Sequence, residues 1–330
     1  MKKRIAIIGA GMAGLTLARR LALNADVVVF EKSRGVGGRM ATRRSDPFSF
    51  DHGAQFFTAR DARFAAFLAP HIASGLVSEW KGKVITLDPE KKVADRIWFE
   101  PHYVANPGMS SLCQKMAEGI QVQLNCEVAP LSNTGLDVGA LLDTAGRDLG
   151  IYDLIISTAP PVQTCRLFDP FLPSSSTLRH STMLACFTMM FGWPGKWNKP
   201  WIAAKINNSP LDWISINSTK PGRNPDQTTL VVHSSNDWAQ QHVDDALPEV
   251  EKYLCEQLRL LLPVDLDTPE YFSLHRWRYA MLLKAHDDEN RELPFYDPGL
   301  KLASVGDWGS KSRIEEVWLE ANLLADQILA

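Results

Sequence analysis

The feature that most constrains the fold is a glycine-rich turn near the start of the chain. Residues 9–14 are Gly-Ala-Gly-Met-Ala-Gly, and they follow an apolar run, Arg4–Ile8, that is typical of a buried strand. A helix is expected over Gly11–Leu23 and a second apolar strand over Val27–Phe30. Strand, glycine turn, helix and strand within about 30 residues predict a compact βαβ unit of the Rossmann type.

Each glycine of this turn has its own expected role. Gly9 permits the tight turn, Gly11 lets the backbone approach a pyrophosphate, and Gly14 allows close packing of helix on strand. The start of the helix presents free N–H groups, including that of Met12, to the phosphates. Glu31 ends the second strand, where a carboxylate is expected to accept the ribose hydroxyls. An acidic residue there disfavours a 2′-phosphate, so the bound dinucleotide is expected to be FAD or NAD.

A second glycine-rich turn favours FAD over NAD. Residues 35–38 are Gly-Val-Gly-Gly, and Arg39 follows directly. A simple NAD dehydrogenase has no need of this turn, whereas the longer FAD molecule requires a second cradle for its phosphates and ribityl chain. We therefore predict FAD, with Lys32, Gly38 and Arg39 among the residues that bind it.

The rest of the chain divides into two kinds of segment. Elements that continue the dinucleotide-binding fold are expected at 109–118, 120–128, 153–157, 301–305 and 314–329. Strand-like runs and one strong helix are expected between them, at 186–191, 213–216, 229–233, 247–262 and 272–279. Residues 192–200 and 220–225 are expected to be surface loops. The predicted class is α/β (α+β overall), with a discontinuous FAD-binding domain (1–58, 105–165 and 299–330) and an inserted mixed-sheet substrate domain (59–104 and 166–298).

Composition and charge exclude several classes of partner. The formal net charge of the 330 residues is -3, so no overall basic field attracts nucleic acid or an anionic membrane. The five cysteines are scattered without a C-x-x-C pair, which argues against a disulfide framework or a zinc site and favours a reducing compartment. The first apolar run ends at Arg19 and Arg20 and is too short to span a bilayer. We therefore expect a cytoplasmic protein without a metal site.

Taken together, these motifs resemble those of the flavin amine oxidase superfamily and, within it, of its bacterial renalase-like members. The resemblance covers nearly the whole chain and implies an amine-oxidase/p-hydroxybenzoate-hydroxylase-like architecture. It implies that the Asp-His-Gly-Ala-Gln-Phe segment at 51–56 borders the isoalloxazine ring, with Gln55 and Phe56 at the cofactor. It also implies that the backbone of Val128, at the end of the strand expected at 120–128, contacts adenine.

At the C-terminal end, the resemblance implies that Asp307 lies near the ribityl–phosphate region. The following helix, entering at Ile314, is expected to point its N-terminus at the pyrimidine edge of the flavin. This chain lacks the nearby cysteine that tethers flavin in some family members, so the FAD is expected to be non-covalent.

The same resemblance implies the substrate. It implies a dinucleotide whose nicotinamide ring carries the hydride at position 2 or 6, in NAD or NADP form, which FAD oxidises while dioxygen is reduced to hydrogen peroxide. A dihydropyridine expels hydride without an acid or base, so stacking and orientation suffice and no catalytic side chain is assigned. Because this substrate carries a pyrophosphate, cationic groups are expected around it. The candidate substrate-binding residues are Phe57, Thr58, Arg60, Arg96, Trp277, Arg278 and Tyr279. No protein partner is indicated.

Several alternatives stay open. Strand alternation places His275, Trp277 and Tyr279 on one face and the intervening arginines on the other, which also fits an ordinary packed strand. A flavin amine oxidase would need a lysine near the flavin, and Lys205 and Lys284 are available. A non-catalytic binding protein on the same fold would need no flavin. The single histidines at 52, 102 and 233 are expected to be structural.

Overall fold

The computed structural model describes residues 2–90, 92–131, 139–169, 171–172, 176–262, 268–283, 294–309 and 313–330. Its internal contacts divide the chain into two discontinuous units. The first comprises Met1–Gly38, Leu112–Met183 and Leu282–Ala330, and the second comprises Arg39–Ser111 and Leu184–Met281.

The first unit is built on a six-stranded sheet. Its strand order is β18 (Phe295–Asp297), β19 (Leu302–Ser304), β12 (Leu154–Ser157), β1 (Arg4–Ile8), β2 (Asp26–Phe30) and β9 (Gln121–Gln123). The strands from β19 to β9 pair in parallel, and β18 pairs antiparallel with β19. A parallel sheet whose chain order reverses beside β1 confirms the predicted Rossmann-type fold.

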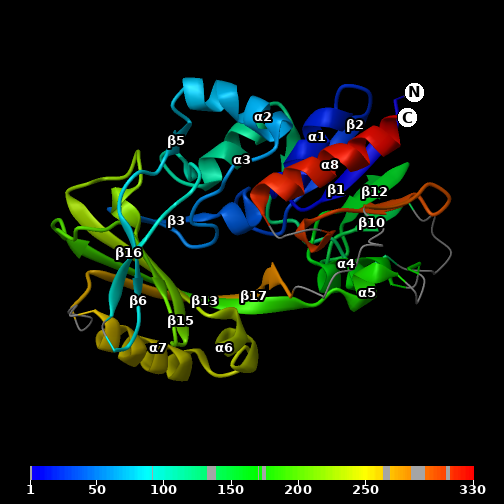
Figure 1. Cartoon of the computed structure of the whole chain (residues 1–330). Helices are drawn as coiled ribbons and strands as arrows, with labels where there is room; N and C mark the ends of the chain where they lie inside the picture. Colours follow the sequence, from blue (N-terminus) through cyan, green and yellow to red (C-terminus); the bar gives the residue numbers. More distant parts are fainter. Residues whose placement is uncertain are drawn as a thin grey trace. The chain divides into compact units, whose positions relative to one another are not determined.

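Helices and a hairpin complete this unit. They are α1 (Met12–Leu21), α3 (Ser110–Ala117), β10 (Ala140–Leu142), β11 (Asp148–Ile151), α4 (Pro161–Phe168), α5 (Thr177–His180) and α8 (Ile314–Leu329). Figure 1 shows α8 lying alongside α1, and Arg20 and Asp326 form an ion pair between them at 2.5 Å. The core includes Phe30, whose ring contacts that of Tyr152 edge-on at 5.9 Å.

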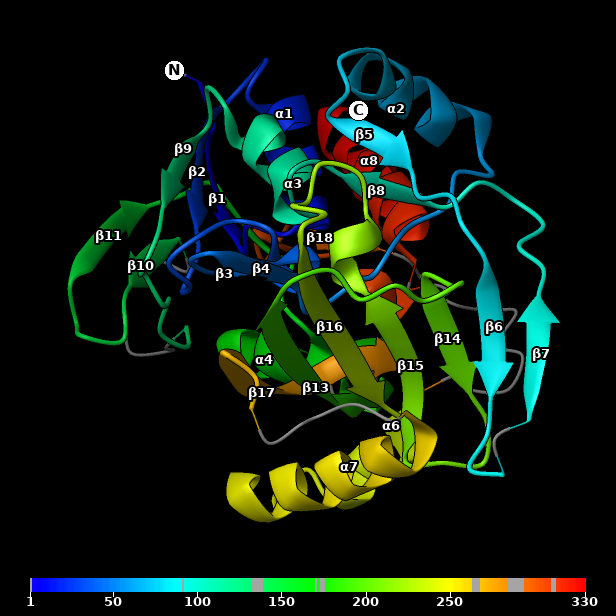
Figure 2. The ribbon, with the colours of Figure 1, turned by 90° about the vertical axis from the view of Figure 1, so that its left-hand side faces the viewer.

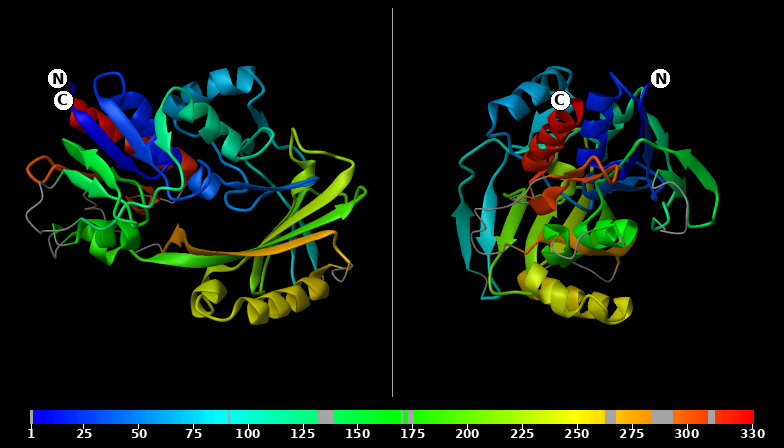
Figure 3. Two further views of the ribbon diagram at one scale, coloured as in Figure 1. Left: turned by 180° about the vertical axis from the view of Figure 1, so that it is seen from behind. Right: turned by 90° about the vertical axis from the view of Figure 1, so that its right-hand side faces the viewer.

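The second unit is built on a seven-stranded sheet. Its order is β17 (Tyr271–Leu282), β13 (Met183–Pro194), β16 (Gln227–Ser234), β15 (Leu211–Ile216), β14 (Ala203–Ile206), β6 (Val84–Leu87) and β7 (Val93–Arg96). Strands β16 to β7 follow one another in Figure 2, and Figure 3 shows the long strands β13 and β17 side by side. Strands β14 and β6 are parallel, whereas β13–β16, β16–β15, β15–β14 and β6–β7 are antiparallel.

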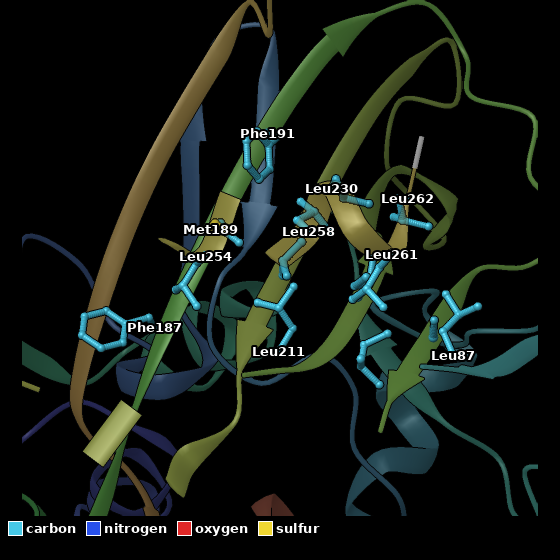
Figure 4. Close-up of a cluster of buried hydrophobic side chains, with 14 of the residues drawn as sticks. Leu87, Phe187, Met189, Phe191, Leu211, Leu230, Leu254, Leu258, Leu261 and Leu262 are labelled. Carbon is cyan, nitrogen blue, oxygen red and sulfur yellow. The ribbon is translucent and has the colours of Figure 1, made fainter. Parts of the chain in front are cut away.

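One face of this sheet is covered by α7 (Leu247–Leu261). Leu254 and Leu258 of the helix are fully buried against strand residues such as Phe187 and Leu230, as Figure 4 shows. Burying one such side chain contributes about 1.5–3 kcal/mol, so this interface holds the helix on the sheet. The other elements of the unit are η1 (Gly38–Met40), β3 (Thr42–Ser45), β4 (Phe48–Asp51), α2 (Ala62–Ala73), β5 (Val77–Glu79), β8 (Tyr103–Ala105), η2 (Asn217–Thr219) and α6 (Asn236–Gln241).

The boundaries of the two units differ from those expected from the sequence. Residues 39–58 and 105–111, expected in the FAD-binding domain, belong to the second unit. One reason is the β3–β4 hairpin, whose Phe48 and Phe50 form a buried cluster with β13 and β16. The described parts of 166–183 and 282–298 belong instead to the first unit, where Phe168 joins the core and β18 extends the sheet.

Two local expectations were also wrong. The strand expected over 120–128 ends at Gln123, because Asn125 adopts a left-handed conformation with φ of 53°. The chain then turns so that the N–H groups of Asn125 and Cys126 donate to the carbonyls of Ser33 and Glu31. The loop expected over 192–200 begins later, because β13 continues to Pro194.

Among the helices that the structure describes, none combines the length and the apolar character needed to cross a membrane.

Candidate functional site

The glycine turn of the first unit has the geometry that the sequence predicts. Gly9 has a φ of 106°, which favours glycine, and a Cβ on Gly14 would lie 2.0 Å from the Gly9 carbonyl oxygen. Helix α1 begins at Met12 without a side-chain cap on its N-terminus. A Cβ on Gly11 would meet no protein atom within 4 Å, so the space beside this residue is free for a phosphate group.

Glu31 binds the first glycine turn and the segment that leads into the second. Its carboxylate accepts hydrogen bonds from the N–H groups of Ala10 and Ser33, both at 2.8 Å. The N–H of Gly37 donates to the Ala10 carbonyl, and a Cβ on Gly38 would lie 3.5 Å from the Cα of Gly11. An ionised carboxylate offers about four acceptor positions, so Glu31 still has capacity for two ribose hydroxyls.

The C-terminal part of this unit leaves buried polar atoms without partners. The indole Nε1 of Trp308 and the hydroxyl of Ser304 are buried and form no hydrogen bond within the described residues. Leaving a buried group unsatisfied costs about 1–3 kcal/mol, and the acceptor-rich FAD would satisfy such groups. Together with the open space at Gly11, these atoms show that the residues present fit a bound FAD.

The other predicted cofactor residues of this unit differ in burial and in the charges around them. Asp307 is buried in the 3₁₀ turn η3 (Asp307–Gly309), and α8 begins at Ile314 as expected. Glu315 and Glu316 occupy the first turn of α8, so the positive end of its dipole is already partly neutralised. Val128 is buried in an isolated bridge with Asp143, and Lys32 is exposed. Contacts of Val128, Asp307 and Lys32 with FAD remain predictions.

Arg39, Gln55 and Phe56 lie in the second unit. The side chain of Arg39 donates to the Ala280 carbonyl at 3.2 Å. The Arg39 carbonyl accepts from the N–H of Ala54, and a Cβ on Gly53 would lie 2.0 Å from that oxygen. The segment 51–56 is therefore packed tightly against the chain that follows the second glycine turn.

This segment begins at a buried ion cluster that the sequence did not predict. Asp51 is completely buried and pairs with Lys220 at 3.1 Å and with Arg223. Burial alone would raise the pKa of Asp51, but the two cations, the Met109 N–H and the Thr42 hydroxyl together lower it to about 2. Burial lowers the pKa of Lys220 to about 8, against the opposing effect of Asp51. The expectation that 220–225 forms a surface loop was therefore wrong for Lys220 and Arg223, whose side chains are buried.

Gln55 holds the segment in shape. Its Oε1 accepts from the Ser215 hydroxyl at 2.7 Å and from Lys220 at 3.3 Å. Its Nε2 donates to the carbonyls of Asp51 and Gly53. The amide is therefore engaged with its own unit, which indicates that Gln55 positions the segment rather than offering a free side chain to the cofactor.

The face of the sheet opposite α7 carries a row of polar and aromatic side chains. Strand pairing places Thr188, His233, Trp213 and Lys205 directly beside one another on β13, β16, β15 and β14. Directly opposed residues share one face of a sheet, so we call this the polar face. Lys205, the lysine considered for an amine oxidase, forms an ion pair with Asp212. Lys284 lies outside the described residues.

Three histidines that lie far apart in the sequence, His52, His233 and His275, come together beside this face. Burial lowers the pKa of His52 to about 3, with further lowering by His275 and Arg43, and lowers the pKa values of His233 and His275 to about 4. All three imidazoles are therefore neutral at pH 7. Trp277 stacks on the His52 ring, and its indole N–H donates to the main-chain carbonyl of His52 at 3.0 Å.

The predicted alternation along β17 is confirmed for this part of the strand. His275 and Trp277 face His52, whereas the Arg276 guanidinium lies over the Phe187 ring, in the core under α7. Tyr279, on the same side as Trp277 by alternation, is half-buried.

The remaining substrate candidates are not brought together. Arg60 binds Glu100, and Arg278, on the α7 side of the sheet by alternation, binds Asp244. Phe57 is buried, with its backbone bridged to Tyr103, so it is a core residue. Thr58 is half-buried and Arg96 is exposed.

The residues described contain no group of three or more His, Cys, Asp or Glu side chains placed to hold a metal ion. None of the five cysteines, all of which lie in the described part of the chain, is joined in a disulfide.

Residues 7–69 match a family described as NAD(P)-binding Rossmann-like domain, and residues 85–329 match one described as flavin containing amine oxidoreductase. The chain belongs to this flavin-containing family. Its cofactor is FAD, in agreement with the sequence prediction and with the fit of the glycine turns.

Curated relatives match only a short stretch. The 4,4'-diapophytoene desaturases (4,4'-diaponeurosporene-forming) of Staphylococcus haemolyticus and of Staphylococcus aureus strain Newman are 44% identical over 64 residues and 42% identical over 67 residues. These alignments cover 19% and 20% of this chain and 13% of each relative. The chain therefore matches a small part of the length of these relatives.

Solved structures are similar over almost the whole chain. A putative protoporphyrinogen oxidase from Exiguobacterium sp. 255-15 has a TM-score of 0.74 at 14% identity, covering 99% of both chains. A putrescine oxidase bound to putrescine has a TM-score of 0.73 at 13% identity, covering 100% of this chain and 99% of the other. At these identities the likeness shows the shared fold alone.

Proposed function

We propose that this FAD-dependent oxidoreductase is a renalase-type oxidase of nicotinamide dinucleotides misreduced at ring position 2 or 6. The overall reaction consumes the dihydronicotinamide, a proton and dioxygen, and yields NAD(P)⁺ and hydrogen peroxide. When bound, FAD supplies the acceptor for the hydride and passes the two electrons to dioxygen. The residues of this chain bind and orient the two partners and keep water away.

The observation that carries the proposal is the charge of the Asp51 cluster. Asp51 is the only buried carboxylate among the described residues of the second unit, and Lys220 and Arg223 both pair with it. One negative and two positive charges leave this site cationic. All three side chains are buried, so they act on a ligand through their net positive field, which disfavours a protonated amine and favours an anionic dinucleotide.

The neutral histidines support the same proposal. With pKa values of about 3 to 4, His52, His233 and His275 carry no charge at neutral pH. Hydride leaves a dihydropyridine without a proton transfer, so uncharged stacking surfaces suffice for this chemistry.

Oxidation of a primary amine or polyamine is the second candidate. It is favoured by the family and by Asp212, a carboxylate that lies beside Lys205 on the strand next to it. Asp212 is already paired with that lysine, which reduces its attraction for a further cation.

Anaerobic mixing of the purified holoenzyme with a panel of reductants tests the proposal. The panel contains 2- and 6-dihydroNAD, 2- and 6-dihydroNADP, ordinary NADH (4-dihydroNAD), putrescine and a simple primary amine. We expect rapid loss of the flavin's blue absorption with the 2- or 6-isomers and a much slower change with the others. Rapid loss with an amine, and none with any dihydronicotinamide, would establish the second candidate instead.

A further inference from the structure

A cluster of aromatic rings lies beside the polar face of the second unit. It consists of Phe56, Trp80, Trp98, His102 and Trp213, and we call it the aromatic cluster. The Trp98 and His102 rings stack at 3.7 Å with an interplanar angle of 15°, and Phe56 lies 4.3 Å from His102 and 5.8 Å from Trp213. Trp80 is 1% exposed, whereas Phe56, Trp98 and Trp213 keep part of their surface accessible.

The cluster contains a hydrogen-bond donor without a partner. The Trp213 Nε1 is buried and makes no hydrogen bond within the described residues. Trp80, by contrast, donates from its indole to Thr219 at 3.2 Å. His102 bonds the Glu100 carbonyl through Nδ1, and burial lowers its pKa, which favours the neutral ring. The cluster therefore offers neutral stacking surfaces and one unsatisfied donor.

Strand register places a cation on the same side of the sheet. Arg96 of β7 lies opposite Val84, which lies opposite Ala203, which in turn lies opposite Ser215. Ser215 donates to Gln55 on the polar face, so Arg96 projects from that face too. Arg96 is exposed and has no ion-pair partner among the described residues, whereas Arg60 and Arg278 are each paired with a carboxylate.

An adenine nucleotide needs this combination of groups. Its base has π faces for stacking and ring nitrogens that accept from a donor, and its phosphates pair with arginine. In the substrate of the proposed function, the nicotinamide must lie against the flavin to deliver its hydride. The adenine half is then left for side chains of the protein to hold.

We propose that the aromatic cluster and Arg96 form the subsite for the adenosine diphosphate half of the dinucleotide substrate. This inference rests on the proposed function. The base stacks on the accessible rings, Trp213 donates to a ring nitrogen, and Arg96 pairs with the diphosphate. The subsite increases affinity without touching the reacting ring, so it contributes to substrate binding and not to the hydride step.

The test combines variants with a truncated substrate. Arg96→Gln is the main variant, because this side chain is exposed and its loss leaves the fold intact. Arg278→Gln, which removes an exposed arginine on the opposite face, is the matched control. Trp98→Leu removes an accessible ring, and Trp98→Phe restores one. Each protein is reduced anaerobically by the preferred dihydro-dinucleotide and by the corresponding mononucleotide, which lacks the adenylate half.

We expect Arg96→Gln to weaken binding of the dinucleotide by about tenfold or more and to leave mononucleotide binding unchanged. Trp98→Leu should weaken the dinucleotide by about fivefold or more, with recovery in Trp98→Phe. ADP-ribose, followed by calorimetry, should bind the wild type and bind Arg96→Gln less tightly, which checks the subsite without turnover.

Equal losses for dinucleotide and mononucleotide, or equal effects of Arg96→Gln and Arg278→Gln, would overturn the subsite. In both cases the wild type is still reduced by dihydronicotinamides, so the proposed function stands. If no dihydronicotinamide reduces the wild-type flavin, the proposed function has failed instead, and the two failures are distinguishable.

Discussion

The two units of this protein hold their functional groups in different ways. In the first, main-chain atoms of two glycine turns form the predicted dinucleotide cradle within one short stretch, and the Gly37 N–H joins the turns by donating to the Ala10 carbonyl. In the second, side chains from distant segments assemble around Asp51, and its partners Lys220 and Arg223 are 169 and 172 residues away. A cradle made by the backbone requires glycine at set spacings, which can be recognised in the sequence. A cluster of side chains from distant segments leaves no such local pattern in the sequence.

The largest effect on FAD binding is expected from a substitution in the backbone cradle. Gly11→Val should abolish FAD binding, because the new side chain occupies the space that the pyrophosphate needs. No protein atom lies within 4 Å of a Cβ there, so the apoprotein should fold as the wild type does. Flavin content after purification measures the loss, and thermal unfolding of the two apoproteins is the control. Normal flavin content in the folded variant would refute the site.

The next effect concerns the side-chain cluster. Asp51→Asn leaves Lys220 and Arg223 buried without their counter-charge, so the free energy of unfolding should fall by about 3–5 kcal/mol. Asp212→Asn, which breaks the partly exposed pair with Lys205, should cost about 1 kcal/mol or less. Denaturant unfolding of both variants measures the contrast. An equal fall in the free energy of unfolding for both variants would show that burial does not make the Asp51 pairs more important than the Lys205–Asp212 pair.

The stabilisation by Asp51 should depend on pH. Its pKa is lowered from 3.8 in the unfolded chain to about 2 in the folded protein. A carboxyl with a depressed pKa stabilises the fold above its unfolded value and loses that contribution as the pH falls toward about 2. The difference in stability between wild type and Asp51→Asn should therefore shrink below pH 3.8.

A smaller effect is expected at Glu31. Glu31→Ala removes the acceptor for the ribose and for the N–H groups of Ala10 and Ser33, so FAD binding should weaken by at least about 1.5–3 kcal/mol. Asp26→Ala, at the exposed start of the same strand, should leave the dissociation constant unchanged. Flavin fluorescence during titration of the apoproteins with FAD measures both. An unchanged affinity in Glu31→Ala would remove Glu31 from the site.

No covalent link to FAD is expected. Burial raises the pKa values of Cys113 and Cys186 to about 12, so these thiols stay protonated. Acid precipitation should therefore release all of the flavin into the supernatant. Flavin retained on the washed pellet would contradict a non-covalent cofactor.

The parts of the fold that were predictable follow from periodic patterns. Strand β1 and helix α8 have the bounds expected from the sequence, because an apolar run and a helical repeat are local properties. Asn125 ended β9 early through a left-handed backbone conformation that hydrophobicity does not encode. The β3–β4 hairpin joined the second unit through a buried cluster with distant strands, which a glycine motif does not encode.

The candidate site divides in the same way. The roles predicted for Gly9 and Gly14 are confirmed, since each is a backbone requirement at a fixed spacing, whereas the ribose contact of Glu31 stays a prediction. Lys220 was assigned to a surface loop because its surroundings are rich in proline and glycine. Only the tertiary structure shows that the loop folds inward, where the Lys220 ammonium lies 5.3 Å from the Trp80 ring centre and pairs with Asp51.

A single anaerobic turnover shows whether a misreduced nicotinamide dinucleotide is the substrate. One equivalent of 2- or 6-dihydroNAD(P) is mixed with the holoenzyme, and the loss of flavin absorption is compared with the amount of ordinary NAD(P)⁺ formed. We expect equal amounts of bleached flavin and oxidised product. Unchanged flavin with every dihydronicotinamide isomer, together with bleaching by an amine, would contradict this expectation.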